Sequence, residues 1–184
     1  MRIGLLAGML CSAVLATAAT NGHMSDWKQR LAERIPLYGH RNWIVVADSA
    51  YPAQARGGIE TIVADADQIE VLKVVLQKLA ASKHVRPIIH MDRELQYLRE
   101  SDAPGVDAYR REVFTLLPKD KIATSLHENI IRQLDEAGQT FRVLIIKTNM
   151  TVPYTSVFLQ LDCAYWTPEE ERKLREEMGK SPDK

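Results

Sequence analysis

The chain has 184 residues, and its 24 lysines and arginines balance 24 aspartates and glutamates, so its formal net charge at pH 7 is zero. Hydrophobic residues make up 46% of it, which is enough for the buried core of one ordinary globular domain and excludes disordered and fibrous proteins. A neutral chain without any block of basic residues is also not expected to bind nucleic acid or an anionic membrane, which leaves a small or neutral partner as the expectation.

The first twenty residues differ in composition from the rest of the chain. Arg2 is their only charged residue, residues 3–15 are apolar, and Ala16-Thr17-Ala18 matches a signal-peptidase site. We therefore predict a signal peptide over residues 1–20, cleavage near Ala19, and export to the periplasm or the extracellular space. The alternative is an uncleaved anchor, but the stretch is shorter than the ~20 apolar residues of a spanning helix, so no stable membrane span is expected after processing.

Cysteine usage limits how the mature chain can be stabilised. Cys11 lies in the predicted signal peptide, so Cys163 is the single cysteine expected in residues 21–184. One thiol cannot form an intrachain disulfide. The mature domain must therefore be held together by its hydrophobic core.

The first elements expected in the mature chain are a helix and a buried strand. Ser25 can cap the helix and Pro36 ends it. Its apolar positions recur every four residues, at Trp27, Leu31 and Ile35. Residues 43–47 are a continuous apolar run, which is typical of a strand covered on both faces. Asp48 follows this strand, at the edge where open α/β sheets bind ligands.

Two more strands and further helices are expected in the middle of the chain. Residues 59–63 and 85–91 predict strands, and Asp67 followed by Glu70 resembles the cap of a helix between them. The apolar face of that helix consists of Ile69, Leu72, Val75, Leu76 and Leu79. Residues 92–117 predict two short helices, separated by a loop at residues 103–105.

A capping box marks the next helix. In Ser125-Leu-His-Glu128 the serine hydroxyl and the glutamate carboxylate can each satisfy a free backbone N–H group. This places His127 in the first turn of the helix, and Gly138 is its expected C-terminal stop.

The last part of the chain predicts two strands and a charged helix. The strands are expected over residues 141–147 and 154–161, and a charged helix and tail over residues 167–184, starting at Thr167. Helices alternate with strands, and no internal repeat interrupts the pattern. We therefore expect residues 21–184 to form a single α/β domain, a three-layer α/β/α sandwich.

Motifs of nucleotide, hydrolase and cysteine-metal sites are missing from the sequence. There is no Walker A loop, no G-x-G-x-x-G, no G-x-S-x-G and no paired-cysteine site. Polar residues at strand ends and helix starts are the remaining candidates for a site, namely His40, Asp48, His127, Tyr154 and Ser156. Tyr154 and Ser156 lie two apart on a predicted strand, so both are expected to point to the same face.

Several segments resemble the family of D-ribose pyranases and L-fucose mutarotases. The resemblance begins at Gly39-His40, continues eight positions on through Ile44-Val-Val-Ala-Asp48, and includes Tyr51-Pro52-Ala53. Ile62-Val-Ala-Asp65 and Pro153-Tyr-Thr-Ser-Val-Phe-Leu159 are similar to later segments of the family. The resemblance spans residues 37–161 and implies a mixed, mostly parallel sheet.

The resemblance also implies a role for each candidate residue. His40 would be the acid/base group, Asp48 a ligand of sugar hydroxyls, and Tyr154 a further ligand or proton-transfer partner. His127 is similar to the second histidine of ribose pyranases. Ser156 replaces the family's asparagine among the substrate-binding residues, and serine lacks the reach and the two-headed amide of that residue.

The implied activity interconverts anomers, or pyranose and furanose forms, of a free and neutral monosaccharide. Opening the cyclic hemiacetal removes the anomeric hydroxyl proton and protonates the ring oxygen, so a matched acid and base suffice and no cofactor or metal is expected. Because the family assembles as rings with sugar sites near subunit boundaries, we also expect a homo-oligomer.

A second hypothesis is a non-catalytic protein of the same fold that binds sugar or forms interaction rings. Each candidate residue also has a structural interpretation. His40 could be an ordinary loop residue, Asp48 a turn former and Tyr154 a strand aromatic. His84 and His90 are expected to be structural or exposed, and His90 with Asp92 is too small a cluster for a metal site.

Overall fold

The structure is a computed structural model that describes residues 26–180. The predicted signal peptide, its cleavage site, Cys11 and the predicted helix cap Ser25 lie outside the described residues. Among the helices of residues 26–180, none combines the length and the apolar character needed to cross a bilayer.

Six strands form one sheet: β1 Trp43–Ala47, β2 Ile59–Val63, β3 Val85–Asp92, β4 Ile122–Ser125, β5 Val143–Lys147 and β6 Val157–Cys163. Their order across the sheet is β2-β5-β1-β6-β3-β4. β6 runs antiparallel to its neighbours β1 and β3, whereas the other strand pairs are parallel. The sheet is therefore mixed and mostly parallel, as the resemblance predicted.

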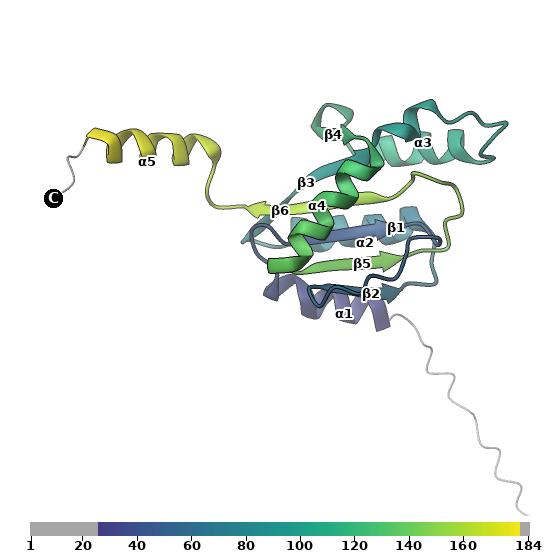
Figure 1. Ribbon diagram of the computed structural model, residues 1–184, viewed down its shortest axis with the longest axis horizontal. Coiled ribbons are helices and arrows are strands. Elements are labelled where there is room, and N and C mark those ends of the chain that lie inside the picture. Colours follow the sequence, from purple (N-terminus) through teal and green to yellow (C-terminus); the bar gives the residue numbers. More distant parts are fainter. Residues whose placement is uncertain (1–25, 181–184) are drawn as a thin grey trace, which may run out of the picture.

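Helices cover both faces of this sheet (Figure 1). The α-helices are α1 Asp26–Arg34, α2 Gln68–Ala80, α3 Val106–Leu116, α4 His127–Thr140 and α5 Pro168–Lys180, and short 3-10 helices span Ile35–Leu37, Arg93–Tyr97 and Lys119–Lys121. Side chains of α1, α2 and α3 pack in one core, and those of α4 pack in a second core on the opposite face. The predicted three-layer α/β/α sandwich is confirmed. The charged helix α5 extends away from the sheet beyond the end of β6 (Figure 1).

The apolar run of β1 explains why two cores can form. All five residues of β1 are buried, and alternate side chains enter opposite cores. Ile44 and Val46 face α1, α2 and α3, whereas Trp43, Val45 and Ala47 face α4. The prediction of a strand covered on both faces is confirmed, and it fixes Asp48 at the carboxyl edge of the sheet.

The structure confirms two predicted helix starts. The Asp67 side chain caps α2 by accepting hydrogen bonds from the backbone N–H groups of Ile69 at 2.8 Å and Glu70 at 3.1 Å. At the start of α5, the Thr167 hydroxyl accepts a hydrogen bond from the backbone N–H of Glu170 at 3.2 Å. The Glu170 carboxylate in turn accepts one from the backbone N–H of Thr167 at 2.6 Å. Both helices therefore begin where the sequence predicted.

The predicted capping box at residues 125–128 is wrong. Ser125 is the last residue of β4, a strand that the sequence analysis did not predict, and the cap position of α4 is Leu126. Glu94, from the 3-10 helix Arg93–Tyr97, accepts hydrogen bonds from the backbone N–H of His127 instead, at 3.1 and 3.2 Å. A carboxylate distant in sequence therefore replaces the expected local cap.

Two other expectations need correction. Strand β6 begins at Val157, so Tyr154 and Ser156 lie in the loop before it and do not share a strand face. Gly138 does not end α4, which continues to Thr140. Gly138 is instead a point of close approach, because a Cβ there would lie 2.8 Å from the Ile59 side chain.

The contact between Gly58 and Gly138 predicts a position-specific effect on stability. A Cβ on Gly58 would lie 2.2 Å from the Gly138 carbonyl oxygen and 2.6 Å from that of Phe141, and backbone atoms cannot easily give way. We expect Gly58→Ala to lower the free energy of unfolding by about 2 to 3 kcal/mol, measured by urea denaturation. Gly57→Ala is the matched control, because nothing lies within 4 Å of its added Cβ. Equal stability of the two variants would contradict this packing.

Candidate functional site

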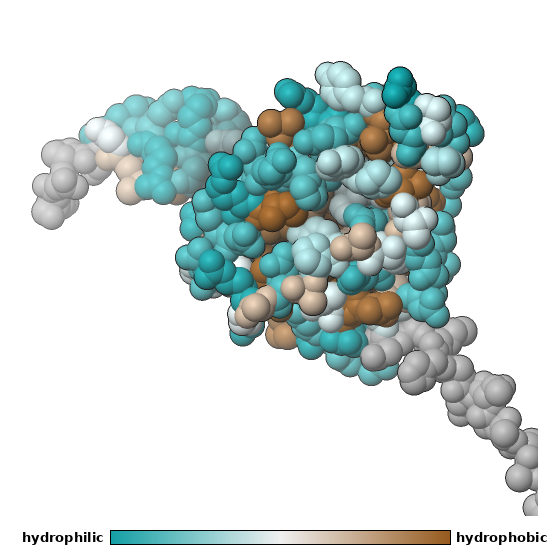
Figure 2. All heavy atoms as spheres, turned by 45° about the vertical axis from the view of Figure 1, so that its right-hand side comes forward, coloured by the Kyte–Doolittle hydropathy of each residue, from teal (hydrophilic) through white to brown (hydrophobic). Residues whose placement is uncertain are grey.

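A cavity of about 390 Å³ lies at the carboxyl edge of the sheet, where β1 and β5 end. Its volume falls in the range of small-molecule sites. Figure 2 brings this side of the molecule forward and shows hydrophobic residues in separate small patches among hydrophilic ones. The residues that line the cavity are Asp48, Ser49, Ala50, Tyr51, Pro52, His127, Thr151, Val152, Pro153 and Tyr154. Three of the predicted site residues, Asp48, His127 and Tyr154, therefore meet at one opening.

Asp48 is held in place by hydrogen bonds to both of its carboxylate oxygens. Oδ2 accepts from the Ser156 hydroxyl at 2.9 Å, and Oδ1 accepts from the backbone N–H of Ala50 at 3.0 Å. The Ser156 hydroxyl is 3.2 Å from the backbone nitrogen of Asp48 and accepts its hydrogen bond. Ser156 is only 1% exposed and does not line the cavity. The structure thus places Ser156 beneath Asp48, as a support for its carboxylate.

His127 is the first residue of α4 and presents its ring to the cavity. Its Nδ1 lies 3.0 Å from Oδ2 of Asp92, and its ring meets that of Tyr154 edge-on, with the ring centres 5.6 Å apart and the planes at 80°. Its backbone N–H is bound by Glu94, as described above. Contacts with three separate segments therefore fix both the backbone and the ring of His127.

Asp92 is a site residue that the sequence analysis missed. It ends β3, is 1% exposed, and its Oδ1 has no hydrogen-bond partner among the described residues. Burial raises the pKa of Asp92 to about 6, although the hydrogen bond with His127 acts in the opposite direction. A signal was present in the sequence, because Asp92 directly follows the predicted strand of residues 85–91, just as Asp48 follows that of residues 43–47.

A buried hydrogen-bond network positions the loop that carries Tyr154. The Gln68 amide donates to the backbone carbonyl of Thr155 and to the Tyr109 hydroxyl, which itself donates to the same carbonyl. The Thr148 hydroxyl is 3.2 Å from the Gln68 amide oxygen and 2.9 Å from the carbonyl oxygen of Ala47. Thr155 is thus tied to α2 and α3. Its neighbour Tyr154 adopts a φ of 57°, an unfavourable angle for a non-glycine residue.

His40 is separated from the other predicted site residues. It precedes β1, whereas Asp48 follows it, and a five-residue strand spans about 16 Å. His40 is exposed, and its Nδ1 lies 3.2 Å from Oδ1 of Asp162, whose Oδ2 accepts hydrogen bonds from Arg86 at 2.8 and 3.1 Å. Burial acts to raise the pKa of Asp162, but hydrogen bonds, first among them that of Arg86, hold it below its usual value. Within one chain, His40 therefore cannot reach a ligand that contacts Asp48.

The other histidines that the sequence analysis considered have structural partners. His84 Nε2 lies 3.0 Å from the carbonyl oxygen of Tyr38, and His84 Nδ1 lies 2.8 Å from the Ser82 hydroxyl. The His90 ring packs against Trp43, with the ring centres 5.2 Å apart. Across residues 26–180, no three His, Cys, Asp or Glu side chains come together in a way that could hold a metal ion.

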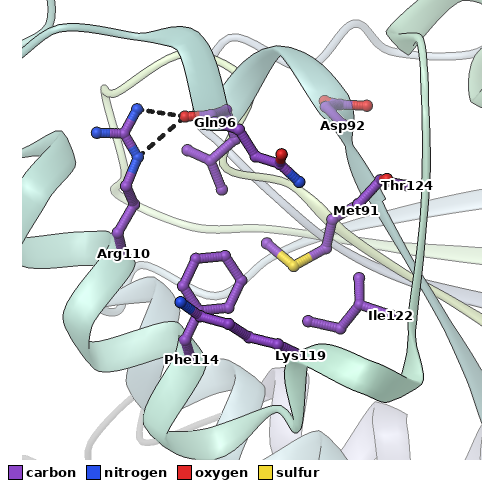
Figure 3. Close-up of a pocket in the computed structure, with 9 residues that line it drawn as sticks. Met91, Asp92, Gln96, Arg110, Phe114, Lys119, Ile122 and Thr124 are labelled. Carbon is purple, nitrogen blue, oxygen red and sulfur yellow. Dashed lines mark hydrogen bonds between the residues drawn. The ribbon is translucent and has the colours of Figure 1, made fainter.

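A second cavity of about 390 Å³ is lined in part by Asp92 (Figure 3). Its walls are largely apolar and consist of Met91, Leu95, Phe114 and Ile122, with Gln96, Arg110, Lys119 and Thr124 as polar members. The dashed lines in Figure 3 show that Arg110 is engaged by the backbone carbonyl of Leu95. Lys119 lies over the Phe114 ring, 4.6 Å from its centre. The two cationic groups here, Arg110 and Lys119, are therefore directed at the protein itself, and the carboxylate of Asp92 pairs with His127, which lines the first cavity. The first cavity is therefore the better candidate site.

The raised pKa of Asp92 predicts a pH-dependent stability. In the folded state the Asp92 carboxyl keeps its proton up to about pH 6, whereas in the unfolded chain the carboxyl loses its proton near pH 3.8. The proton therefore stabilises the fold fully below about pH 4, and this contribution of roughly 3 kcal/mol is lost as the pH rises through 6. The amide side chain of the variant Asp92→Asn cannot ionise. The free energy of unfolding of this variant, relative to that of the wild type, should therefore rise by roughly 2 to 3 kcal/mol between pH 4 and pH 7.5.

Urea denaturation at a series of pH values measures this difference. Asp162→Asn is the control with the opposite sign, because the pKa of Asp162 is lowered in the fold. Its carboxylate stabilises the fold above the unfolded-state pKa, so this variant should lose stability relative to the wild type as the pH rises. Parallel curves for Asp92→Asn and the wild type would contradict a buried, ionising Asp92.

Three solved structures resemble the chain. RbsD from Bacillus subtilis, complexed with D-ribose, has 16% sequence identity and a TM-score of 0.52, over 72% of this chain and 91% of that chain. FucU from Bifidobacterium longum has 17% identity and a TM-score of 0.49, over 72% and 92% of the two chains. The fucose mutarotase from Streptococcus pneumoniae, in complex with L-fucose, has 18% identity and a TM-score of 0.48, over 72% and 91%.

No protein-family model matches the sequence, and no curated protein matches it. The likeness to RbsD therefore lies in the arrangement of the strands and helices. It extends over most of the described residues and nearly all of the RbsD chain. The protein has the RbsD fold that the segments around His40, Asp48 and Tyr154 predicted.

Proposed function

We propose that the protein is a monosaccharide mutarotase or pyranase, an isomerase that opens and recloses the ring of a free sugar without a cofactor. The observation that carries this proposal is the meeting of Asp48, His127 and Tyr154 at one cavity of the RbsD fold. The solved structure of RbsD with D-ribose supports a neutral monosaccharide as the ligand class. The signal-peptide pattern of residues 1–20 adds the proposal that the protein is exported.

The cavity residues supply the groups that ring opening needs. His127 can accept the proton of the anomeric hydroxyl, because a histidine near neutral pH exchanges protons readily. Asp48 is held by Ser156 and Ala50 with its carboxylate at the cavity, where it can accept hydrogen bonds from sugar hydroxyls. Tyr154 lies beside His127 and can donate its hydroxyl proton toward the ring oxygen. Reclosure on the other face, or through another hydroxyl, gives the other anomer or ring size.

His40 enters this proposal through a second copy of the chain. Its Nδ1 is engaged by Asp162, so its Nε2 is the nitrogen available to a ligand. It lies at the opposite end of β1 from the cavity and is exposed, so a neighbouring subunit could bring it to the sugar. The ring assembly implied by the sequence resemblance has its sites near subunit boundaries. We therefore propose a homo-oligomer whose site combines His127 of one subunit with His40 of the next.

Saturation-transfer NMR on a panel of free sugars tests the reaction. The wild type should accelerate anomer exchange of at least one sugar, and His127→Ala should slow it by about 10²- to 10⁴-fold, the usual contribution of a general acid or base. Asp48→Asn should weaken sugar binding by roughly 1.5 to 3 kcal/mol, as a charge-assisted hydrogen bond is lost. Tyr154→Phe removes the hydroxyl that is proposed to donate a proton to the ring oxygen. Its matched control is Tyr165→Phe, because Tyr165 is exposed and does not line the cavity.

The same panel separates the alternatives. Binding of a sugar without accelerated exchange would replace the enzyme by the non-catalytic sugar-binding protein of the second hypothesis. That hypothesis has a structural basis, because Ser156 is directed at Asp48 and leaves the cavity without the asparagine expected there. Neither binding nor exchange with any sugar would refute the proposed function.

Mixing inactive variants tests the shared site. His40→Ala and His127→Ala should each abolish accelerated exchange as pure proteins, while circular dichroism stays unchanged because neither residue is buried. When the two are unfolded and refolded together in equal amounts, about a quarter of the intersubunit sites would combine two intact histidines, so activity should return to that extent. Light scattering that shows only monomers, or mixtures without activity, would contradict the proposed assembly.

A further inference from the structure

Asp92 is buried and lies against His127, whose side chain is 37% exposed. We propose that Asp92 is a positioning residue that holds His127 with its proton on Nδ1, so that Nε2 is the proton acceptor in the cavity. The catalytic consequence of this pairing rests on the proposed function, whereas the tautomer of His127 does not.

The geometry of the pair determines the direction of the hydrogen bond. Oδ2 of Asp92 lies 3.0 Å from Nδ1 of His127. An ionised carboxylate only accepts hydrogen bonds, so Nδ1 must donate. A neutral imidazole carries one proton, which leaves Nε2 without one and able to accept. Free imidazole exchanges between its two tautomers, so a fixed Nδ1–H form requires such a partner.

Asp92 is well placed to impose this orientation because its own position is fixed. It is the last residue of β3 and pairs with Ser125 of β4 in the sheet register. His127 begins α4 two residues after Ser125, and Glu94 binds its backbone N–H. The edge of the Tyr154 ring bounds the imidazole from another side. The ring therefore lies between Asp92 and Tyr154, on a backbone that Glu94 holds.

The charges around His127 favour an acceptor role. Asp92 from β3, Glu94 from the following 3-10 helix and Asp48 from the end of β1 are acidic groups that influence one another in this region. A positive charge that develops on the ring when Nε2 takes a proton is stabilised by the Asp92 carboxylate. Tyr154 is the other titratable group in contact with the ring.

The cost of burying Asp92 points to a functional role for the pair. Its side chain is 1% exposed, and Oδ1 has no partner among the described residues, although a buried carboxylate is normally fully hydrogen-bonded. The pair of His40 and Asp162 lacks this property, because Arg86 shares the Asp162 carboxylate. A residue that weakens the fold at neutral pH and contacts the one histidine in the cavity is best explained by its effect on that histidine.

Long-range ¹H–¹⁵N NMR of the full chain with ¹⁵N-labelled histidine rings tests the tautomer directly. The resonances of His127 are assigned by their loss in His127→Gln. In the wild type above pH 7.5, we expect His127 in the Nδ1–H form. In Asp92→Asn, the amide can either donate or accept, so the spectrum should show a mixture of tautomers or the Nε2–H form.

Asp162→Asn is the matched control, since it makes the same substitution at the other histidine–aspartate pair. It should alter the ring signals of His40 and leave those of His127 unchanged. A wild-type His127 in the Nε2–H form, or as a mixture of tautomers, would overturn the proposal. The wild-type spectrum alone decides this point, even where Asp92→Asn folds poorly.

Exchange kinetics test the catalytic consequence separately. With a sugar that the wild type turns over, Asp92→Asn should lower kcat by about 10²-fold with little change in KM, and Asp92→Glu should restore part of the loss. An unchanged kcat in Asp92→Asn would overturn the positioning role. If the wild type turns over no sugar but the Nδ1–H form is observed, the proposed function fails while the assigned tautomer stands.

Discussion

Strand β1 lies between β5 and β6 in the sheet, and this position is the constraint on which the rest of the structure depends. All residues of β1 are buried, so its two ends are the points at which polar side chains can first reach solvent. His40 lies before one end and Asp48 after the other. This single strand therefore separates the two residues that open the family resemblance, and it makes a site within one chain incompatible with a role for both.

The polar side chains at the carboxyl edge of the sheet are positioned by hydrogen bonds from residues that are distant in sequence. Ser156 fixes Asp48, Glu94 caps the helix that presents His127, and Gln68 with Tyr109 holds the loop that presents Tyr154. These supports are largely buried, so their hydrogen bonds are protected from competition with water. The cavity is consequently lined by side chains whose positions are determined by the core, although most of them lie on loops.

The two histidine–aspartate pairs show how the same contact acquires different properties. The carboxylate of Asp162 is exposed enough to bind Arg86, and its charge is compensated. That of Asp92 is buried against His127 and carries an oxygen without a partner in the described structure. Such a group opposes folding at neutral pH, because burial disfavours its charged form. Stability given up at a cavity in this way is a frequent sign of function.

The sequence by itself determined the α/β sandwich, five of the six strands, the helices and the cap at Asp67, because apolar spacing and local capping depend on neighbouring residues. It also singled out Asp48, His127 and Tyr154. Only the tertiary structure decided that Glu94 rather than Ser125 caps α4, that Ser156 supports Asp48, that Asp92 binds His127, and that His40 lies apart. Each of these facts depends on which strand ends meet in the sheet, and strand order is set by long-range packing, which no local pattern encodes.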